Sequence, residues 1–347
     1  MVWVVSPHVS RWLQVGSAFV VVFLTGCWVP AENEVVVYAA LDREFSEPIL
    51  KQFEQQTGIA VRAKYDVEST KTVGLVTRII EERERPGCDV FWNNEILHTL
   101  RLDQLGLLSA YQSSRAEQFP ASYRSAQGLW YGMAARARVL LVNREQVAEG
   151  ERPQSLADLT DPRWRDRVGI AKPLFGTTAT HAAVLFATWG DARAQEFFRR
   201  MKGNVRILSG NKQVAIAVGH GQLAFGLTDT DDAIIEVEQG RPVDIVFPDQ
   251  QPGALGTLLI PNTVALVRGG PHARQAERLL EFLLTPAVEE QLAQGRSSQI
   301  PLQKSVSATA RVLANRSVKW MEVDFAAAAT AWEHAAGFLR DEFAAAD

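Results

Sequence analysis

Strands and helices alternate through the first third of this 347-residue sequence, and this alternation restricts the fold more than any other feature. The runs with the length and apolar character of buried β-strands are residues 34–38, 59–65 and 89–92. Residues 45–56 and 70–84, which lie between them, carry apolar side chains at helical spacing. This order predicts a parallel sheet covered by helices. Ligands of such sheets bind beyond the carboxyl ends of the strands, so the turns after these strands are candidate site positions.

The alternation continues more loosely through the rest of the chain. Residues 130–143 form a long extended pattern. Shorter strands are expected near residues 168–170, 205–208, 223–227, 243–247, 258–260 and 263–268. Helices are expected over residues 178–188, 191–201, 212–218, 273–284, 288–294 and 325–343. The pattern contains no internal repeat and fits two α/β lobes better than a string of independent modules.

The segment from Gly226 to Ala233 places three carboxylates within four residues, directly after an apolar run. Like charges at this spacing raise at least one pKa unless a cation or a set of backbone donors holds them. One interpretation is helix capping, with Asp229 as the N-cap and Asp232 in the first turn. The other is a ligand site in which Asp229, Asp231 and Asp232 take part.

The N-terminus has the features of a secretory signal. Arg11 precedes the apolar residues 12–24, a stretch too short to span a bilayer comfortably, and small residues follow it. The end of this segment, Leu24-Thr-Gly-Cys27, looks like the lipobox of bacterial lipoproteins. We therefore expect residues 1–26 to be a lipoprotein-type signal peptide and Cys27 to be the lipidated residue. An uncleaved membrane anchor is the alternative.

Composition and motifs exclude several classes of protein. The chain is 47% hydrophobic and 22% charged, which is a globular balance, and its formal net charge of −4 argues against a nucleic-acid partner. The sequence contains no zinc-protease, serine-hydrolase or P-loop motif, so a secreted metal-dependent hydrolase is only an alternative to a non-enzymatic function. The one other cysteine, Cys88, lies in a strand pattern and is expected to be a buried, unreactive thiol.

Several segments together resemble one family. They are the lipobox-like signal, Val35-Val-Val-Tyr38-Ala-Ala-Leu-Asp-Arg-Glu-Phe45, Phe53-Glu-Gln-Gln-Thr-Gly-Ile59, Asp89-Val-Phe-Trp-Asn-Asn-Glu95, Leu159-Thr-Asp-Pro-Arg-Trp164, Pro248-Asp-Gln250 and Pro261-Asn-Thr263. This pattern resembles the extracellular solute-binding proteins of ABC importers, and among them the ferric-ion-binding proteins. The resemblance implies a two-lobed α/β fold of the type II periplasmic-binding-protein, or Venus-flytrap, class. A hinge would join the lobes, and a membrane permease would receive the ligand.

The resemblance also implies positions for the ligand contacts. Ferric-binding members have a His shortly after the first strand, where this chain has Asp42, and many have a Glu where this chain has Asn93, Asn94 and Glu95. Two adjacent tyrosines of those members correspond here to Asp231 and Asp232. Carboxylates are hard oxygen ligands suited to hard cations. We therefore expect a metal set of Asp42, Glu95, Asp231 and Asp232, without the family's tyrosine pair.

Elements suited to an anion accompany these acids. Thr177 and Thr178 enter a helix after a glycine, Asn211 opens another helix, and Arg136 lies on the long extended segment. In the family, the corresponding loop holds a synergistic anion beside the metal. No catalytic cofactor is expected. The residues leave open a second solute class, a phosphorylated or zwitterionic molecule such as a sugar phosphate or an aminophosphonate.

The resemblance finally sets the expected domain organisation. Lobe 1 would comprise residues 35–136 plus 264–347, and lobe 2 residues 137–263. The chain would cross between them near Arg136 and near Asn262. The protein would be a monomer in the periplasm or at the cell surface, lipid-anchored to the membrane.

Overall fold

The protein is described from a computed structural model that covers residues 1–4, 33–66, 73–313 and 316–343. The chain divides into two compact units, Met1–Glu32 and Asn33–Asp347. All elements below belong to the second unit. Most of the expected signal segment, including Cys27, lies outside the described residues. Within them, no helix is both long enough and apolar enough to cross a membrane.

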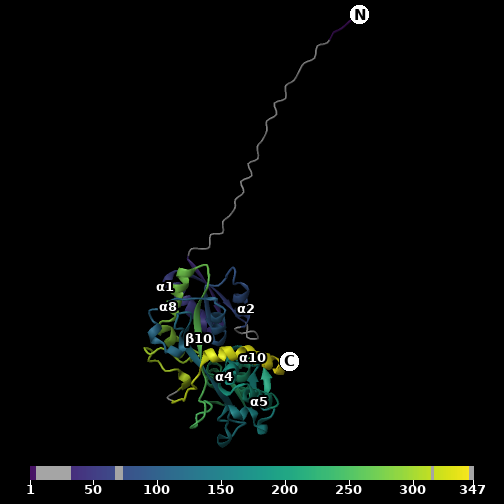
Figure 1. The fold of residues 1–347 in the computed structure, drawn as a ribbon, viewed down its shortest axis with the longest axis vertical. Coiled ribbons are helices and arrows are strands. Elements are labelled where there is room, and N and C mark those ends of the chain that lie inside the picture. Colours follow the sequence, from purple (N-terminus) through teal and green to yellow (C-terminus); the bar gives the residue numbers. More distant parts are fainter. Residues whose placement is uncertain (5–32, 67–72, 314–315, 344–347) are drawn as a thin grey trace. The chain divides into compact units, whose positions relative to one another are not determined.

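The second unit is a mixed α/β structure (Figure 1). The strands are β1 (Glu34–Ala39), β2 (Ala60–Tyr65), β3 (Val90–Asn93), β4 (Leu108–Ser109), β5 (Tyr131–Asn143), β6 (Val168–Ala171), β7 (Arg206–Leu208), β8 (Phe225–Asp229), β9 (Val243–Val246) and β10 (Leu259–Val267). The helices are α1 (Arg43–Thr57), α2 (Val73–Glu81), α3 (Leu97–Gln104), α4 (Gly176–Trp189), α5 (Asp191–Lys202), α6 (Asn211–Gly219), α7 (Thr230–Glu238), α8 (Ala273–Leu283), α9 (Pro286–Gln294) and α10 (Phe325–Phe343).

The strands join in the order β2-β1-β3-β10-β5-β8-β6-β7, with β4 paired to β10 and β9 to β5. β1 runs parallel to β2 and β3, as the strand–helix alternation predicts. β6 runs parallel to β7 and β8. The antiparallel strands β10 and β5 lie between these two parallel groups. β5 pairs with β10 through its first half and with β8 through its second half, so this one strand belongs to both groups.

Two features of the secondary structure differ from expectation. Residues 258–260 and 263–268 were expected to be separate strands, yet β10 is continuous across them and across Pro261, which lacks a backbone donor. The strand tolerates Pro261 because its register with β5 shifts between Pro261 and Asn262, and such irregularities accommodate proline. The short elements α3 and β4 were not expected, since α3 is buried almost all round and shows no clear amphipathic period.

Helix α1 illustrates how the sequence fixes an element. Phe45, Ile49 and Phe53 recur on one face and are buried in the main core cluster. The helix ends at Gly58, whose φ of 68° is left-handed and whose N–H donates to the carbonyl of Glu54 at 2.8 Å.

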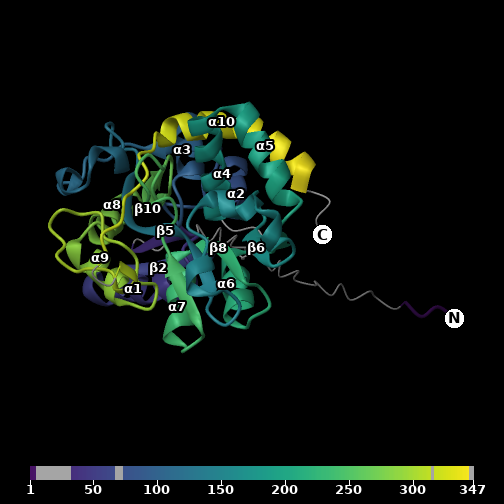
Figure 2. The ribbon, with the colours of Figure 1, turned by 90° about the horizontal axis from the view of Figure 1, so that it is seen from below.

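At the other end of the chain, α10 packs along α4 and also contacts α3 and α5 (Figure 2). Cys88 is buried, and burial raises the pKa of its thiol well above the ordinary value.

Replacing Phe53 by Ala tests whether this face carries the stability of the unit. Phe53 is fully buried, and its ring lies 5.4 Å from that of Phe282. We expect the free energy of unfolding to fall by about 3–5 kcal/mol, because the change removes buried apolar area and leaves a cavity. Urea unfolding measures this effect. Leu105→Ala, at a side chain that is 52% exposed, is the control and should change the value by no more than about 0.5 kcal/mol.

Candidate functional site

A pocket with an empty volume of about 450 Å³ lies where five strands end. Apart from Arg136, which lies within β5, its lining residues lie at or follow the carboxyl ends of β1, β3, β6, β7 and β8, as the rule for parallel strands predicts. They are Asp42, Asn94, Arg136, Ala171, Lys172, Phe175, Gly176, Thr177, Ser209, Gly210, Asn211, Asp229, Asp231 and Asp232.

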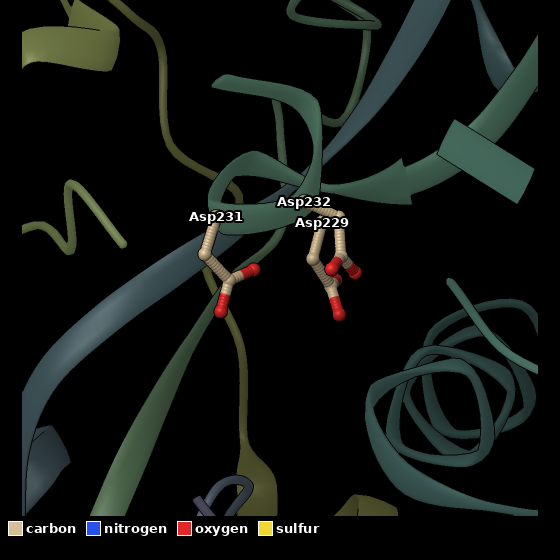
Figure 3. Close-up of side chains that lie close together, drawn as sticks. All are labelled: Asp229, Asp231 and Asp232. Carbon is tan, nitrogen blue, oxygen red and sulfur yellow. The ribbon is translucent and has the colours of Figure 1, made fainter. Parts of the chain in front are cut away.

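Three of the pocket's carboxylates come from one turn. Asp229 ends β8, and Asp231 and Asp232 lie in the first turn of α7. Figure 3 shows their side chains leaving the turn toward the same side. One oxygen from each lies within 4.8 Å of the others. Asp42, the residue before α1, adds a fourth carboxylate from another part of the sheet.

Asp229 occupies the N-cap position of α7 but does not act as a cap. Its side chain makes no capping hydrogen bond. Instead, its carboxylate pairs with the guanidinium of Arg138 at 2.6 Å and accepts hydrogen bonds from Thr177 Oγ1 at 2.5 Å and Asn211 Nδ2 at 3.1 Å. Asp229 therefore belongs to a buried polar cluster, and the helix-capping interpretation of this side chain is wrong.

Arg138 contacts most members of that cluster but does not line the pocket. Its side chain is fully buried, and besides Asp229 it donates to Thr177, Thr178 and Asn211 at 3.0–3.3 Å. These partners lie at the starts of α4 and α6, so one guanidinium ties two helix starts to the end of β8. An unpaired buried arginine would be very costly, which explains why all of these oxygens face it.

Arg136, two residues earlier on β5, points to the same side of the strand and lines the pocket itself. Its Nε lies 3.0 Å from Asp231 Oδ2, and it donates to the carbonyl of Asn94 at 2.7 Å. Burial alone would lower its pKa, but the carboxylates of Asp231, Asp229, Asp42 and Asp232 together raise it above the ordinary value. The acidic residues can therefore lie close together because two buried arginines share their charge.

Helix starts add further positive potential. Gly176 and Asn211, the first residues of α4 and α6, line the pocket, and α7 begins between two of its carboxylates. The N-terminal end of a helix carries a partial positive charge that stabilises anionic groups. The pocket thus offers carboxylate oxygens to a cation and helix starts to an anion.

Most of the side chains expected at the site come together here. Those that line the pocket are Asp42, Asn94, Thr177, Asn211, Arg136, Asp229, Asp231 and Asp232. Thr178 does not line it and instead contacts Arg138 and Asn211. Tyr38 and Trp92, the large aromatic side chains of β1 and β3, are fully buried in the core and do not line the pocket.

Glu95 is not brought to this pocket. Its carboxylate is fully buried and accepts hydrogen bonds from the backbone N–H groups of Leu97 and His98, at the start of α3. Asn93 and Thr180 also donate to it, at 2.9 and 2.7 Å. Burial would raise its pKa, but His98 and these donors lower it below the ordinary value. Glu95 thus holds the start of α3 and contacts α4, and it does not join Asp42, Asp231 and Asp232.

The lining residues that the sequence analysis did not include among the expected ligand contacts are Ala171, Lys172, Phe175, Gly176, Ser209 and Gly210. Lys172 and Ser209 directly follow β6 and β7. Both positions therefore satisfy the rule that ligand-binding residues lie at the carboxyl ends of parallel strands. No sequence signal distinguishes Phe175.

Replacing Arg138 tests how much its charge stabilises the buried carboxylate of Asp229. We expect Arg138→Leu to lower the free energy of unfolding by about 3–5 kcal/mol, because it leaves a buried carboxylate without its cation. The double variant Arg138→Leu/Asp229→Leu should recover part of that loss. Urea unfolding of both variants measures the effect, and a double variant no more stable than Arg138→Leu would contradict the ion-pair interpretation.

His181 gives the fold a defined dependence on pH. Burial, and then the charge of Arg138, lowers its pKa well below the ordinary 6.5. Below about pH 6.5 the unfolded chain therefore binds a proton that the folded chain does not, and stability falls as the pH decreases. Relative to His181→Leu, the wild-type protein should lose up to about 1.4 kcal/mol per pH unit in this window. Unfolding curves from pH 7 to 5 test this, and parallel pH dependences would refute it.

Comparisons with known proteins agree with this geometry. The chain is 26% identical over 330 residues to iron uptake protein A1 of a Synechocystis strain, covering 85% of this chain and 88% of that protein. Its fold matches the apo ferric ion-binding protein A of Pasteurella haemolytica with a TM-score of 0.80 at 22% identity, over 91% of this chain and 99% of the other. It also matches the periplasmic binding protein AfuA of Actinobacillus pleuropneumoniae, solved with fructose-6-phosphate bound, with a TM-score of 0.78 at 22% identity over 90% and 99%.

These likenesses confirm the expected two-lobed α/β fold class. The expected lobe boundaries remain a prediction. The sequence profile for bacterial extracellular solute-binding proteins matches residues 89–329, which is more than half of the chain. The chain therefore belongs to the family of bacterial extracellular solute-binding proteins.

Proposed function

We propose that this protein is the substrate-binding component of an ABC importer and that its cargo is ferric iron or another hard cation, held together with an anion. The observation that carries the proposal is the convergence of four carboxylates, from Asp42 and from the turn after β8, on one pocket. Carboxylate oxygens are preferred by hard cations. Asp42, Asp231 and Asp232 are the proposed ligands.

The charge balance of the pocket supports a cationic cargo. Among the lining residues and the adjacent Arg138, four carboxylates outnumber the positive charges of Arg136, Arg138 and Lys172 by one. A trivalent cation accompanied by a dianion would carry one positive charge and complement this pocket. The start of α4 at Gly176 and Thr177 is the proposed place for that anion.

The donor set departs from that of tyrosine-containing relatives. The chain's five tyrosines all precede residue 132, and none lines the pocket. Several similar proteins are nevertheless named for iron, among them the iron uptake protein of Synechocystis. We propose that carboxylates replace phenolates here, with weaker binding as the consequence, because phenolate is the stronger donor to a ferric ion.

One observation favours a second candidate, a phosphorylated or zwitterionic organic solute. Asp229 and Asp231 are already paired with buried arginines, and these pairs compete with a metal. The structural neighbour AfuA was solved with fructose-6-phosphate. In this alternative, a phosphate group would lie at the starts of α4 and α6, and the acids would accept hydrogen bonds from hydroxyl or amino groups.

The rest of the proposal concerns where the protein acts, with which partner, and in which oligomeric state. Lipidation of Cys27 would tether the protein to the membrane outside the cytoplasm, and a permease would accept the cargo from the closed form. Because its relatives are transport proteins, we propose a carrier without catalytic turnover, acting as a monomer.

Removing two partly exposed carboxylates of the pocket tests the proposal. Asp42 and Asp232 are partly exposed, so Asp42→Asn/Asp232→Asn should leave the apo protein folded. With the wild-type protein, ferric citrate at 100 times the dissociation constant should add about 2.7 kcal/mol of stability. The double variant should lose that gain. Thermal shift with ferric, manganese and calcium ions, fructose-6-phosphate and 2-aminoethylphosphonate measures it, beside elemental composition of the purified protein.

The control is Asp191→Asn, a carboxylate with 56% exposure on α5. It should bind like the wild-type protein. Metal affinity should also fall as the pH approaches the carboxylate range near pH 4, because the ligand atoms must be deprotonated. Unchanged ferric binding in the double variant would reject the metal ligands, and stabilisation only by the phosphorylated compounds would favour the second candidate.

A further inference from the structure

β5 contains a bulge just before it passes from one parallel group to the other. On β10, Pro261 is paired with Ala135 and Asn262 with Met133, so Ala134 is the extra residue on β5. Ala134 has a φ of 37°, a left-handed conformation that is unfavourable for a residue with a Cβ. The bulge is therefore a strained point on the strand that the two groups share.

Polar side chains hold this bulge in place. Asn262, which is fully buried, donates to the carbonyls of Met133, at 3.2 Å, and Ala134. Glu289 of α9 accepts the N–H of Ala134 at 2.6 Å. Beyond the bulge, Ala135 and Ile300 exchange two backbone hydrogen bonds of 2.7 Å. The strained conformation persists because these bonds compensate for it.

Arg136 connects the bulge to the pocket. Its Nη2 donates to Asn262 Oδ1 at 2.9 Å, and its Nε lies 3.0 Å from Asp231. Its Nη1 donates to the carbonyl of Asn94, which follows β3. Arg136 is 2% exposed, so no solvent layer separates these contacts. Because a guanidinium is a rigid planar fork, displacement at one edge moves the other.

We infer that Arg136 is a positioning residue that couples occupancy of the pocket to the conformation of the β5–β10 bulge. A ligand that binds Asp231 competes with Arg136 for its carboxylate. The guanidinium then moves relative to Asn262. This movement changes the strength of the hydrogen bonds that hold Ala134 in its strained conformation. The inference rests on the proposed function for the ligand, but the coupling itself belongs to the ligand-free protein.

The coupling predicts a measurable effect without any ligand. Asp231→Asn in the full chain removes the charge that Arg136 contacts, and it should change amide hydrogen exchange in the peptides covering residues 131–137 and 299–303 by about fivefold or more. In an Arg136→Lys background the same substitution should leave those peptides unchanged. Lysine keeps the positive charge but lacks the planar guanidinium. If Arg136 acted only through its charge, the Arg136→Lys background would retain the effect.

A second background keeps the test decisive if Arg136→Lys is poorly folded. Asn262→Ser leaves Arg136 and Asp231 in contact but removes the amide that reaches the bulge, so it should also abolish the effect. An effect of Asp231→Asn that persists in either background overturns the inference. Asp191→Asn, remote from the pocket, is the control and should not alter these peptides.

Adding ferric citrate to the wild-type protein separates this inference from the proposed function. If the apo coupling is present and ferric citrate neither binds nor changes exchange, the metal proposal fails and the coupling stands. If ferric citrate binds and the apo coupling is absent, the coupling fails and the metal proposal stands.

Discussion

Two arginines buried side by side on β5 are the constraint on which the rest of the site depends. A guanidinium removed from water needs carboxylates and other acceptors around it, and Arg136 and Arg138 find theirs in the turn after β8. This arrangement explains why the chain tolerates Asp229, Asp231 and Asp232 so close together. The acids neutralise the arginines, the arginines hold the acids apart, and neither set would be stable at this depth alone.

The pairing also determines what a ligand must do. Ion pairs with the arginines orient the carboxylates of the pocket, so a ligand loses little free energy in arranging them. With Asp231 as a proposed ligand contact, the bound molecule would have to compete with Arg136 for its carboxylate. A ligand of high charge density succeeds in that competition where a neutral one does not, which gives the pocket selectivity for charge before any fit of shape.

Local pattern was sufficient to predict the scaffold and part of the site. The alternation of strands and helices predicted the parallel group β1–β3 and marked the turns after these strands as candidate site positions, and the family resemblance pointed to Asp42 and Asn94 within them. The errors arose where partners are distant in sequence. Asp229 looked like a helix cap because its true partner, Arg138, lies 91 residues away.

Glu95 was predicted at the site for a related reason. Its spacing after β3 suits a ligand position as well as it suits the start of a helix, and only the backbone donors of the short helix α3 decide between them. The β5–β10 bulge has no sequence signature either, since Ala134 adopts a conformation that its own side chain disfavours.

The placement of the pocket at five strand ends has an evolutionary consequence. Residues such as Lys172 and Ser209 lie just past the last paired residue of β6 and β7, so exchanging them breaks no backbone ladder. Mutation can therefore retune cargo preference at several independent positions while the architecture is inherited intact. Proteins with this scaffold can therefore evolve different ligand specificities through substitutions in these loops alone.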